Sequence, residues 1–460
     1  MTTENKKAGA GELPRVLGLF SIVGIVIGSV IGSGIFIVPA AVAAQVRAPL
    51  LMLAVWVVGG LLSFFGALSF AELGAAYPHA GGMYVYLREA YGPMVAFLFG
   101  WTLFLVIDSG SIATLSVAFS SKYLTFFFPL SPMLQKLIAV ALVAFLVGVN
   151  SLGVRWGALL QNVLMVIKVG AIMAVTVLVL LFAHGDTAHW TAPAEGGLPQ
   201  NLAAAFGVAL VAVLWAYKGW EMATYTAGEF KDPGKNIPRG FLLGTGIVIL
   251  LYLSANLAYL YVFPASTIAQ APRIAADAMN AAVGPVGAAA ISFIILFSIA
   301  GAANGNVLTA PRVLFAMSRD GMFFNKLGEV HPRFLTPHKA ILAMGIWSAV
   351  LCVSGTFEQL FTYVIFGLWI FFSLTVFAVL VLRRTRPDLP RPYRTWGYPV
   401  TPILFVLSAL YISISTLITQ PLNALAGLGI ILTGIPVYCY WMRGKTQKRG
   451  KITHPLSFLL

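Results

Sequence analysis

The sequence predicts an all-α integral membrane protein with about twelve transmembrane helices. Three features predict this class: the composition, the length of the apolar stretches and the placement of charge. Of the 460 residues, 59% are hydrophobic and only 10% are charged, whereas a soluble domain carries about a quarter charged residues. Apolar content this high over such a length cannot be buried in one water-facing core, so we expect lipid to cover it.

Apolar stretches of about spanning length follow one another along the whole chain. The first stretch is far longer than the roughly 7–15-residue apolar region of a signal peptide, so we interpret it as a retained helix. The connections hold most of the Pro, Lys, Arg and Asp residues. The expected spans are 16–44, 50–76, 93–123, 134–153, 158–183 and 201–228, then 238–263, 286–316, 340–355, 357–382, 399–419 and 421–442.

The net charge of +14 is explained by membrane topology. If the N-terminus lies inside and the spans alternate, most Lys and Arg residues fall on the cytoplasmic side, as the positive-inside rule requires. Those that fall outside are Arg47, Lys122, Lys136 and Arg273. We therefore expect a multi-pass protein of the plasma (inner) membrane with both termini cytoplasmic. Membrane lipid is an expected partner and nucleic acid is not.

The first span contains a pair of glycines around a serine, Gly32-Ser33-Gly34. Each glycine lowers helix propensity by about 1 kcal/mol, and glycine lets the backbone come close to a ligand. Non-helical backbone at membrane depth is tolerated where it lines a cavity. The sequence therefore predicts a helix broken between Val30 and Ile35, with a binding site at the break.

The sixth span carries a comparable break, Trp215-Ala216-Tyr217-Lys218-Gly219-Trp220-Glu221. Two interrupted helices five spans apart are typical of inverted-repeat transporters. A half-helix that begins at Ser33 or Gly34 presents free N–H groups, which suit a carboxylate. The ends of the preceding half-helices present unpaired carbonyls, which suit an ammonium group. Such a site favours a zwitterion, which indicates an amino acid.

Several motifs in order resemble the amino acid–polyamine–organocation (APC) superfamily, and within it the L-type amino acid transporter group. The resemblance covers nearly the whole chain. The motifs are IGSGIFIVP (31–39), FAELGAAYPHAGGMYVYL (70–87), AYKGWE (216–221), GEFKDPGKNIPRG (228–240), ANGNVLTAPRVLFAMSRDG (303–321), LRRTRPDLPRP (382–392) and LTGIPVY (432–438).

This resemblance implies a LeuT-type fold, with a 5+5 inverted repeat and helices 1 and 6 broken. The implied organisation is a cytoplasmic tail 1–15, a first repeat 16–183, a second repeat 201–382, two further helices 399–442 and a cytoplasmic tail 443–460. The implied substrate site comprises Val30, Ile31, Gly32, Ser33, Gly34, Ile35, Trp215, Ala216, Lys218 and Gly219.

Roles within that site follow the same resemblance. Amides of the Ser33–Ile35 segment would bind the substrate carboxylate, and carbonyls of Val30, Trp215 and Lys218 its amino group. Trp215 would be the aromatic gate over the substrate. Lys168, in helix 5, would take the place of a sodium ion and contact the broken part of helix 1. An intramembrane lysine is costly and is usually functional.

Two charges depart from the family pattern. Lys218 stands where relatives carry a small or neutral residue, and Asp108 lies in the middle of helix 3. Because an unpaired buried charge is strongly unfavourable, we expect Lys218 to pair with Asp108 or Glu221. A lysine beside the site would repel cationic substrates.

Other polar residues receive structural interpretations. We expect Glu72 and Glu229 to anchor loops through arginine or backbone contacts, and Asn304 and Asn306 to make interhelical hydrogen bonds. The two cysteines, Cys352 and Cys439, lie in apolar segments. We therefore expect no disulfide, no metal site and no cofactor.

The expected function is sodium-independent transport or exchange of neutral L-amino acids by alternating access. The alternative is a proton-coupled permease, or a permease for cationic amino acids or polyamines. Outside that class, a channel or a transport-like nutrient sensor remains open. An enzyme is not expected, because Asp108 and Ser111 have no base partner. Since the loop at about 124–134 has no cysteine, we expect no disulfide-linked heavy chain of the kind found in human-type relatives.

Overall fold

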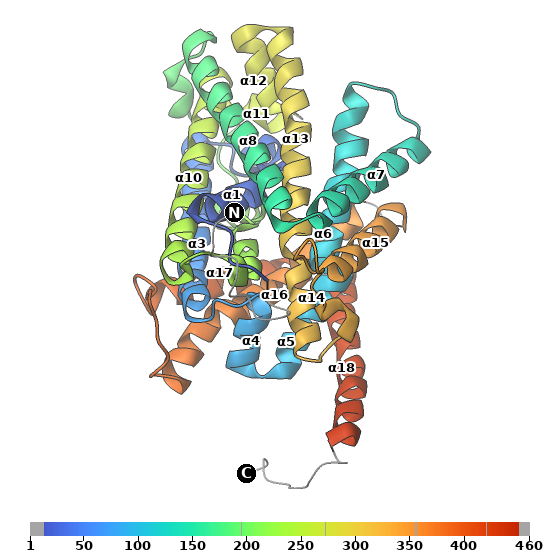
Figure 1. The fold of residues 1–460 in the computed structure, drawn as a ribbon. Helices are drawn as coiled ribbons and strands as arrows, with labels where there is room; N and C mark the ends of the chain where they lie inside the picture. The colour runs from blue at the N-terminus through green and yellow to red at the C-terminus, as the bar shows by residue number, and fades with distance from the viewer. Residues whose placement is uncertain (1–12, 195, 272, 355–356, 420, 450–460) are drawn as a thin grey trace.

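The computed structural model describes residues 13–194, 196–271, 273–354, 357–419 and 421–449, and it is helical almost throughout (Figure 1). Apart from an isolated bridge between Leu17 and Phe230, these residues form no strand. The predicted all-α fold is confirmed. Residues 1–12 and 450–460, which belong to the two expected tails, lie outside the described residues.

The long helices match the expected spans closely. Ten described helices are long and apolar enough to cross a membrane, and the bent pair of α1 (Leu19–Val30) and α2 (Gly34–Val46) makes eleven. The ten are α3 (Pro49–Ala76), the run α5–η2–α6–η3–η4 (Pro93–Thr102, Leu103–Ile107, Asp108–Ala118, Phe119–Tyr123, Leu124–Phe126), α7 (Pro132–Ser151), α8 (Val154–Phe182), α9 with η6 (Leu202–Ala216, Trp220–Glu229), α10 (Pro233–Val262), α13 with α14 (Pro285–Thr309, Pro311–Arg319), α16 (Phe357–Thr385), α17 (Val400–Thr419) and α18 (Pro421–Arg449).

One expected span remains, 340–355. It corresponds to the apolar helix α15 (His338–Ser354), which at 17 residues is shorter than the spanning helices named above. The remaining short elements connect the spans. They are α4 (Met83–Tyr91), η5 (Thr187–Trp190), α11 (Ala265–Gln270), α12 (Ile274–Val283) and η7 (Asn325–Gly328).

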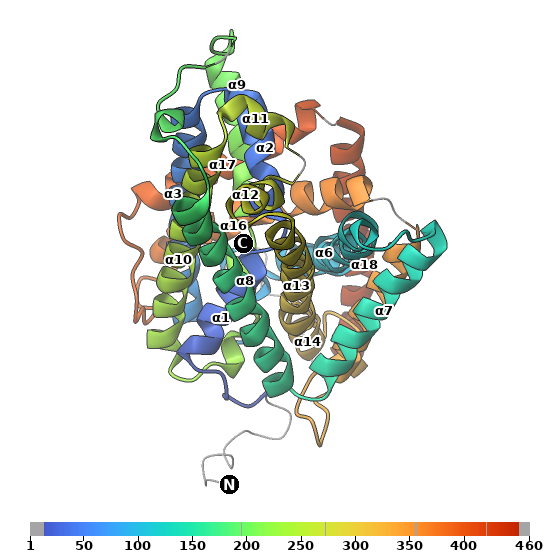
Figure 2. The same ribbon diagram turned by 90° about the horizontal axis from the view of Figure 1, so that it is seen from above.

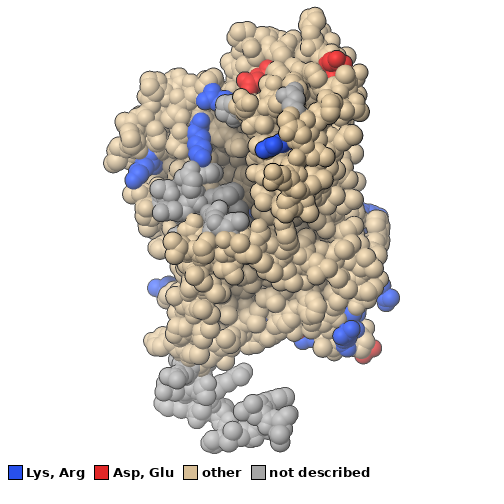
Figure 3. Space-filling view, turned by 180° about the vertical axis from the view of Figure 1, so that it is seen from behind, with Lys and Arg blue, Asp and Glu red and all other residues tan. Residues whose placement is uncertain are grey.

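The surface between the two ends of the molecule is apolar. In Figure 3 the Lys, Arg, Asp and Glu side chains gather toward the two ends, and a broad band between them is largely free of charge. Large apolar side chains such as Phe145 of α7 and Leu250 of α10 are exposed. Exposed apolar area of this extent marks a membrane-facing surface.

The two interrupted spans run through the middle of the bundle. The half-helix α1 packs against α8, α10 and α13, and α2 packs against α9. Figure 2 shows α1 beside α8 and α10, with α13 on the other side of α8. Polar backbone exposed at the breaks is therefore shielded from lipid by neighbouring helices, which is the condition for such breaks inside a membrane.

Ion pairs of Glu72 and Glu229 hold helix ends to neighbouring segments. The expectation that these two glutamates make anchoring contacts with arginine or backbone groups is confirmed. The Glu72 carboxylate accepts hydrogen bonds from Arg383 Nε and Nη2 at 2.9 and 2.6 Å, and from the Thr395 N–H at 2.7 Å. The Glu229 carboxylate accepts from Arg312 Nε at 2.7 Å, with both side chains fully buried. These contacts join α3 to α16 and to the α16–α17 connection, and they join η6 to α14.

Candidate functional site

The first break separates α1 from α2. The half-helix α1 ends at Val30, α2 begins at Gly34, and their axes differ by 44°. Gly34 faces the second broken span so closely that a Cβ added there would lie 2.9 Å from the Cβ of Ala216. The glycine is therefore required for the close approach of the two spans as well as for the break.

The second break separates α9 from η6. The helix α9 ends at Ala216, a turn follows, and the span resumes as the 3₁₀ helix η6. Gly219 lies in the left-handed region with φ +128°, and a Cβ there would lie 2.7 Å from the carbonyl carbon of Ser29. Only glycine fits such a position without strain. Both expected breaks are confirmed. The backbone at Gly219 packs directly against the backbone of Ser29, so the two breaks are in contact.

Tyr252 of α10 joins the two breaks. Its hydroxyl lies 3.3 Å from the carbonyl oxygen of Val30 and 3.2 Å from that of Ala216, the last residues of α1 and α9. Its ring packs edge-on against Trp56 of α3. One buried side chain thus bridges carbonyl groups left open by two interrupted helices.

Lys168 of α8 lies at the first break. Its fully buried ammonium donates to the carbonyl oxygen of Gly28 at 2.7 Å and to that of Ile31. The hydroxyl of Ser298, on α13, donates to the carbonyls of Ile31 and Gly32 at 3.2 and 3.0 Å. The lysine and the serine together satisfy backbone acceptors that the broken helix leaves without a partner of its own.

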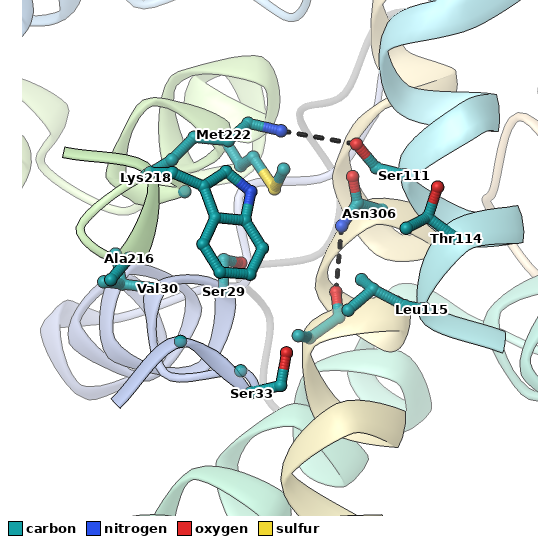
Figure 4. Close-up of a pocket in the computed structure, with 15 residues that line it drawn as sticks. Ser29, Val30, Ser33, Ser111, Thr114, Leu115, Ala216, Lys218, Met222 and Asn306 are labelled. Carbon is teal, nitrogen blue, oxygen red and sulfur yellow. Dashed lines mark hydrogen bonds between the residues drawn. The ribbon is translucent and has the colours of Figure 1, made fainter. Parts of the chain in front are cut away.

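A cavity of about 80 Å³ opens between the two breaks and helices α6 and α13. Because one water needs roughly 10–15 Å³ by such a measure, the cavity suits a small molecule. Its lining is shown in Figure 4 and comprises Ser29, Val30, Gly32, Ser33, Gly34, Ser111, Thr114, Leu115, Trp215, Ala216, Lys218, Gly219, Met222, Ala302 and Asn306.

Most residues predicted from the sequence line this cavity. Ile31 and Ile35 do not line it and are fully buried in the surrounding core. Their side chains pack in the bundle while only their backbone belongs to the break. Lys168 also stays outside the cavity lining.

Several lining residues were not predicted as binding residues. They are Ser29, Ser111, Thr114, Leu115, Met222, Ala302 and Asn306. The α6 residues among them follow the π-helical turn η2, Leu103–Ile107. Such turns insert an extra residue into the helical period and are frequent at functional sites.

The two asparagines of α13 differ in role. Asn304 makes the expected interhelical bonds, accepting from Asn150 Nδ2 and donating to Gln161 Oε1, each at 2.8 Å. Asn306 instead donates to the Ala302 carbonyl of its own helix at 2.9 Å and lines the cavity. The interhelical interpretation is confirmed for Asn304 and wrong for Asn306.

Lys218 reaches the cavity wall and donates to the Ser111 hydroxyl oxygen at 3.3 Å (Figure 4). Within the described part of the chain, no ion pair shorter than 4 Å joins it to Asp108 or Glu221. Both carboxylates are nonetheless buried near enough to attract its charge. Lys218 therefore bonds directly to a neutral hydroxyl, and the expected direct pairing with Asp108 or Glu221 is not formed.

Among the residues that the structure describes, no group of three or more His, Cys, Asp or Glu side chains could hold a metal ion. The cavity lining includes the start of α2 at Ser33 and Gly34, three further hydroxyl-bearing side chains and the ammonium of Lys218. These groups bind and orient a small polar molecule. A membrane-spanning bundle with paired broken helices around such a cavity defines a secondary transporter.

The family model described as "Amino acid permease" matches residues 17–438. The chain belongs to this amino acid permease family, part of the APC superfamily, and it is a multi-span amino acid transporter. Its relatives are transporters and exchangers, so the expectation of a carrier in place of an enzyme is confirmed.

Curated relatives match over nearly their whole length. The human b(0,+)-type amino acid transporter 1 is 33% identical over 98% of this chain and 92% of that protein. The serine/threonine exchanger SteT of Bacillus subtilis is 34% identical over 93% of this chain and 96% of its own length. The human large neutral amino acids transporter small subunit 2 is 30% identical over 95% of this chain and 86% of its own.

Proposed function

We propose that this chain is a sodium-independent exchanger of neutral L-amino acids that works by alternating access. The observation that carries the proposal is the Lys168 ammonium, which donates to the Gly28 and Ile31 carbonyls at the break of the first span. Carbonyls at such a break coordinate sodium in related transporter folds. A fixed ammonium supplies the positive charge there, so transport needs no sodium ion.

The substrate fits the cavity in one orientation. Its carboxylate binds the N–H groups of Ser33, Gly34 and Ile35 at the start of α2, where the helix dipole is positive. Its ammonium binds the carbonyl oxygens of Val30, Trp215 and Lys218, each of which has two lone pairs, and the Trp215 ring closes over it. The two five-helix repeats, 16–183 and 201–382, then move against one another around the bound substrate.

The names of two relatives support this class, one being an exchanger and one a transporter of large neutral amino acids. We place both termini of this chain in the cytoplasm and the protein in the plasma (inner) membrane, since that orientation satisfies the positive-inside rule. It works without a disulfide-linked heavy chain, because its two cysteines lie in α15 and α18, away from the loop at about 124–134.

The test is uptake of a panel of radiolabelled amino acids into proteoliposomes in sodium-free buffer, with and without internal amino acid. We expect saturable uptake of neutral amino acids that internal substrate accelerates. A requirement for sodium would contradict the role of Lys168. Uptake driven by a proton gradient without internal substrate would favour the proton-coupled alternative, and uptake of arginine or a polyamine would favour the cationic one.

A further inference from the structure

One wall of the cavity is polar, and the hydrogen bonds of Ser111 decide which group on this wall is a donor. Ser111 donates its hydroxyl proton to the Ile107 carbonyl at 2.6 Å, so its oxygen is the acceptor for Lys218 Nζ at 3.3 Å. The Lys218 ammonium has three protons, and Ser111 uses one of them. The lysine therefore retains donors at the edge of the cavity.

Further polar atoms on this wall and beside it lack a partner within the described chain. They are Thr114 Oγ1, Asn306 Oδ1 and Ser29 Oγ, each buried and each on a residue that lines the cavity. A buried polar atom without a hydrogen bond costs about 1–3 kcal/mol. Three such atoms around one cavity, beside an ammonium, indicate a site that a polar ligand completes.

Two buried acidic side chains lie behind the wall, outside the cavity lining. Asp108 and Glu221 are 1% and 0% exposed, and neither lines the cavity. Glu221 Oε2 accepts from the Gly219 N–H at 2.9 Å, which fixes this carboxylate behind the second break. Lys218 itself donates to a neutral hydroxyl oxygen, that of Ser111, so the wall presents a hydrogen-bond donor that an uncharged oxygen satisfies.

The polar wall lies where a substrate side chain must point. In Figure 4 Ser33 lies at one end of the cavity and the Lys218–Ser111 pair lies at the other, with Asn306 and Thr114 along one side. A carboxylate bound at Ser33 therefore directs the rest of the molecule toward Lys218.

We propose that Lys218 and Ser111, with Thr114, form a side-chain subsite that selects neutral amino acids with a short oxygen-bearing side chain over apolar amino acids of the same shape. This inference rests on the proposed function and specifies its substrate class. A site that hydrogen-bonds a substrate hydroxyl rejects the analogue without it strongly, because the polar groups of the protein are then left unpaired.

The test compares kcat/KM for two near-isosteric pairs, threonine with valine and serine with alanine, in proteoliposomes. We expect the wild-type protein to prefer the hydroxyl-bearing member of each pair by at least about tenfold. Lys218→Met reduces this ratio to below about threefold, and Lys218→Arg, which keeps a charged donor, retains most of it. Lys235→Met, an exposed lysine at the start of α10, is the matched control and leaves the ratio unchanged.

The outcomes separate this inference from the proposed function. Equal transport of valine and threonine by the wild-type protein would overturn the subsite while leaving amino acid exchange intact. If a Lys218→Met protein whose melting curve shows that it is folded keeps the wild-type ratio of kcat/KM for threonine over valine, the subsite is likewise overturned. If Lys218→Met does not fold, Ser111→Ala and Thr114→Val give the decision, since each removes one hydroxyl of the wall. Failure to transport any amino acid would overturn both proposals.

Discussion

Lys168 Nζ donates to the carbonyl oxygen of Gly28 at 2.7 Å, so helix α8 is joined to the last turn of α1 just before that helix breaks. In an intact helix the Gly28 carbonyl would accept from the amide four residues further on. The break at Ile31–Ser33 removes that donor, and the lysine replaces it. The same ammonium also reaches Ile31, inside the break.

Replacing Lys168 by methionine keeps the volume of the side chain and removes its charge and donors. We expect sodium-free uptake to fall at least tenfold, since two buried carbonyls lose a charge-assisted partner. Initial uptake rates and the melting temperature of the purified protein would be measured together. A folded Lys168→Met carrier with wild-type sodium-free uptake would show that the ammonium is not required.

Gly219 provides a test of the backbone contact between the two breaks. Gly219→Ala places a Cβ 2.7 Å from the Ser29 carbonyl carbon at a φ of +128°, so we expect a lower melting temperature and loss of transport. Gly246→Ala, in the middle of α10, is the control, because nothing lies within 4 Å of its added Cβ. That change should leave transport intact and stabilise the helix by up to about 1 kcal/mol. Equal tolerance of both substitutions would contradict the close packing of the two spans.

The spans and both breaks could be predicted from the sequence because their signals are local. Two glycines around a serine lower helix propensity at Gly34, and a lysine inside a span is rare and costly. The Lys218-Gly219 pair and Lys168 therefore also stand out without knowledge of the packing. The contact of Lys168 with the first break was expected from the family resemblance alone, since no local pattern indicates which helix a buried lysine meets.

The polar wall could not be predicted in the same way. Ser111 and Thr102 both donate to the carbonyl four residues before them, and the sequence gives no means of telling which of them faces a cavity. The π-helical turn at Leu103–Ile107 changes the helical phase between these two residues. Asn304 and Asn306 likewise differ only in the face of α13 that they occupy, which packing decides.

Glu229 and Arg312 form a fully buried ion pair between η6 and α14. We expect Glu229→Gln to destabilise the protein by about 3–5 kcal/mol, because it leaves Arg312 buried without its counter-charge. The double variant Glu229→Gln/Arg312→Met should be more stable than the single one. Thermal unfolding in detergent measures both.

The control for this ion pair is Glu329→Gln, which breaks the exposed pair with Lys339 and should leave the melting temperature nearly unchanged. A Glu229→Gln protein as stable as the Glu329→Gln protein would mean that Arg312 finds another counter-charge.

The hydroxyl of Tyr252 should affect substrate binding more than folding. Tyr252→Phe removes the bridge between the carbonyls of Val30 and Ala216 but keeps the ring packed against Trp56. The stability cost should be about 1 kcal/mol, whereas the loss of alignment between the two breaks should raise the KM for substrate about fivefold or more, because small misplacements at a binding site are costly. Tyr91→Phe, which also loses one hydroxyl–carbonyl hydrogen bond, to Leu374, is the matched control outside the cavity. It should lose similar stability with an unchanged KM. If both variants keep the wild-type KM, the two breaks hold their positions through backbone packing at Gly34 and Gly219 alone.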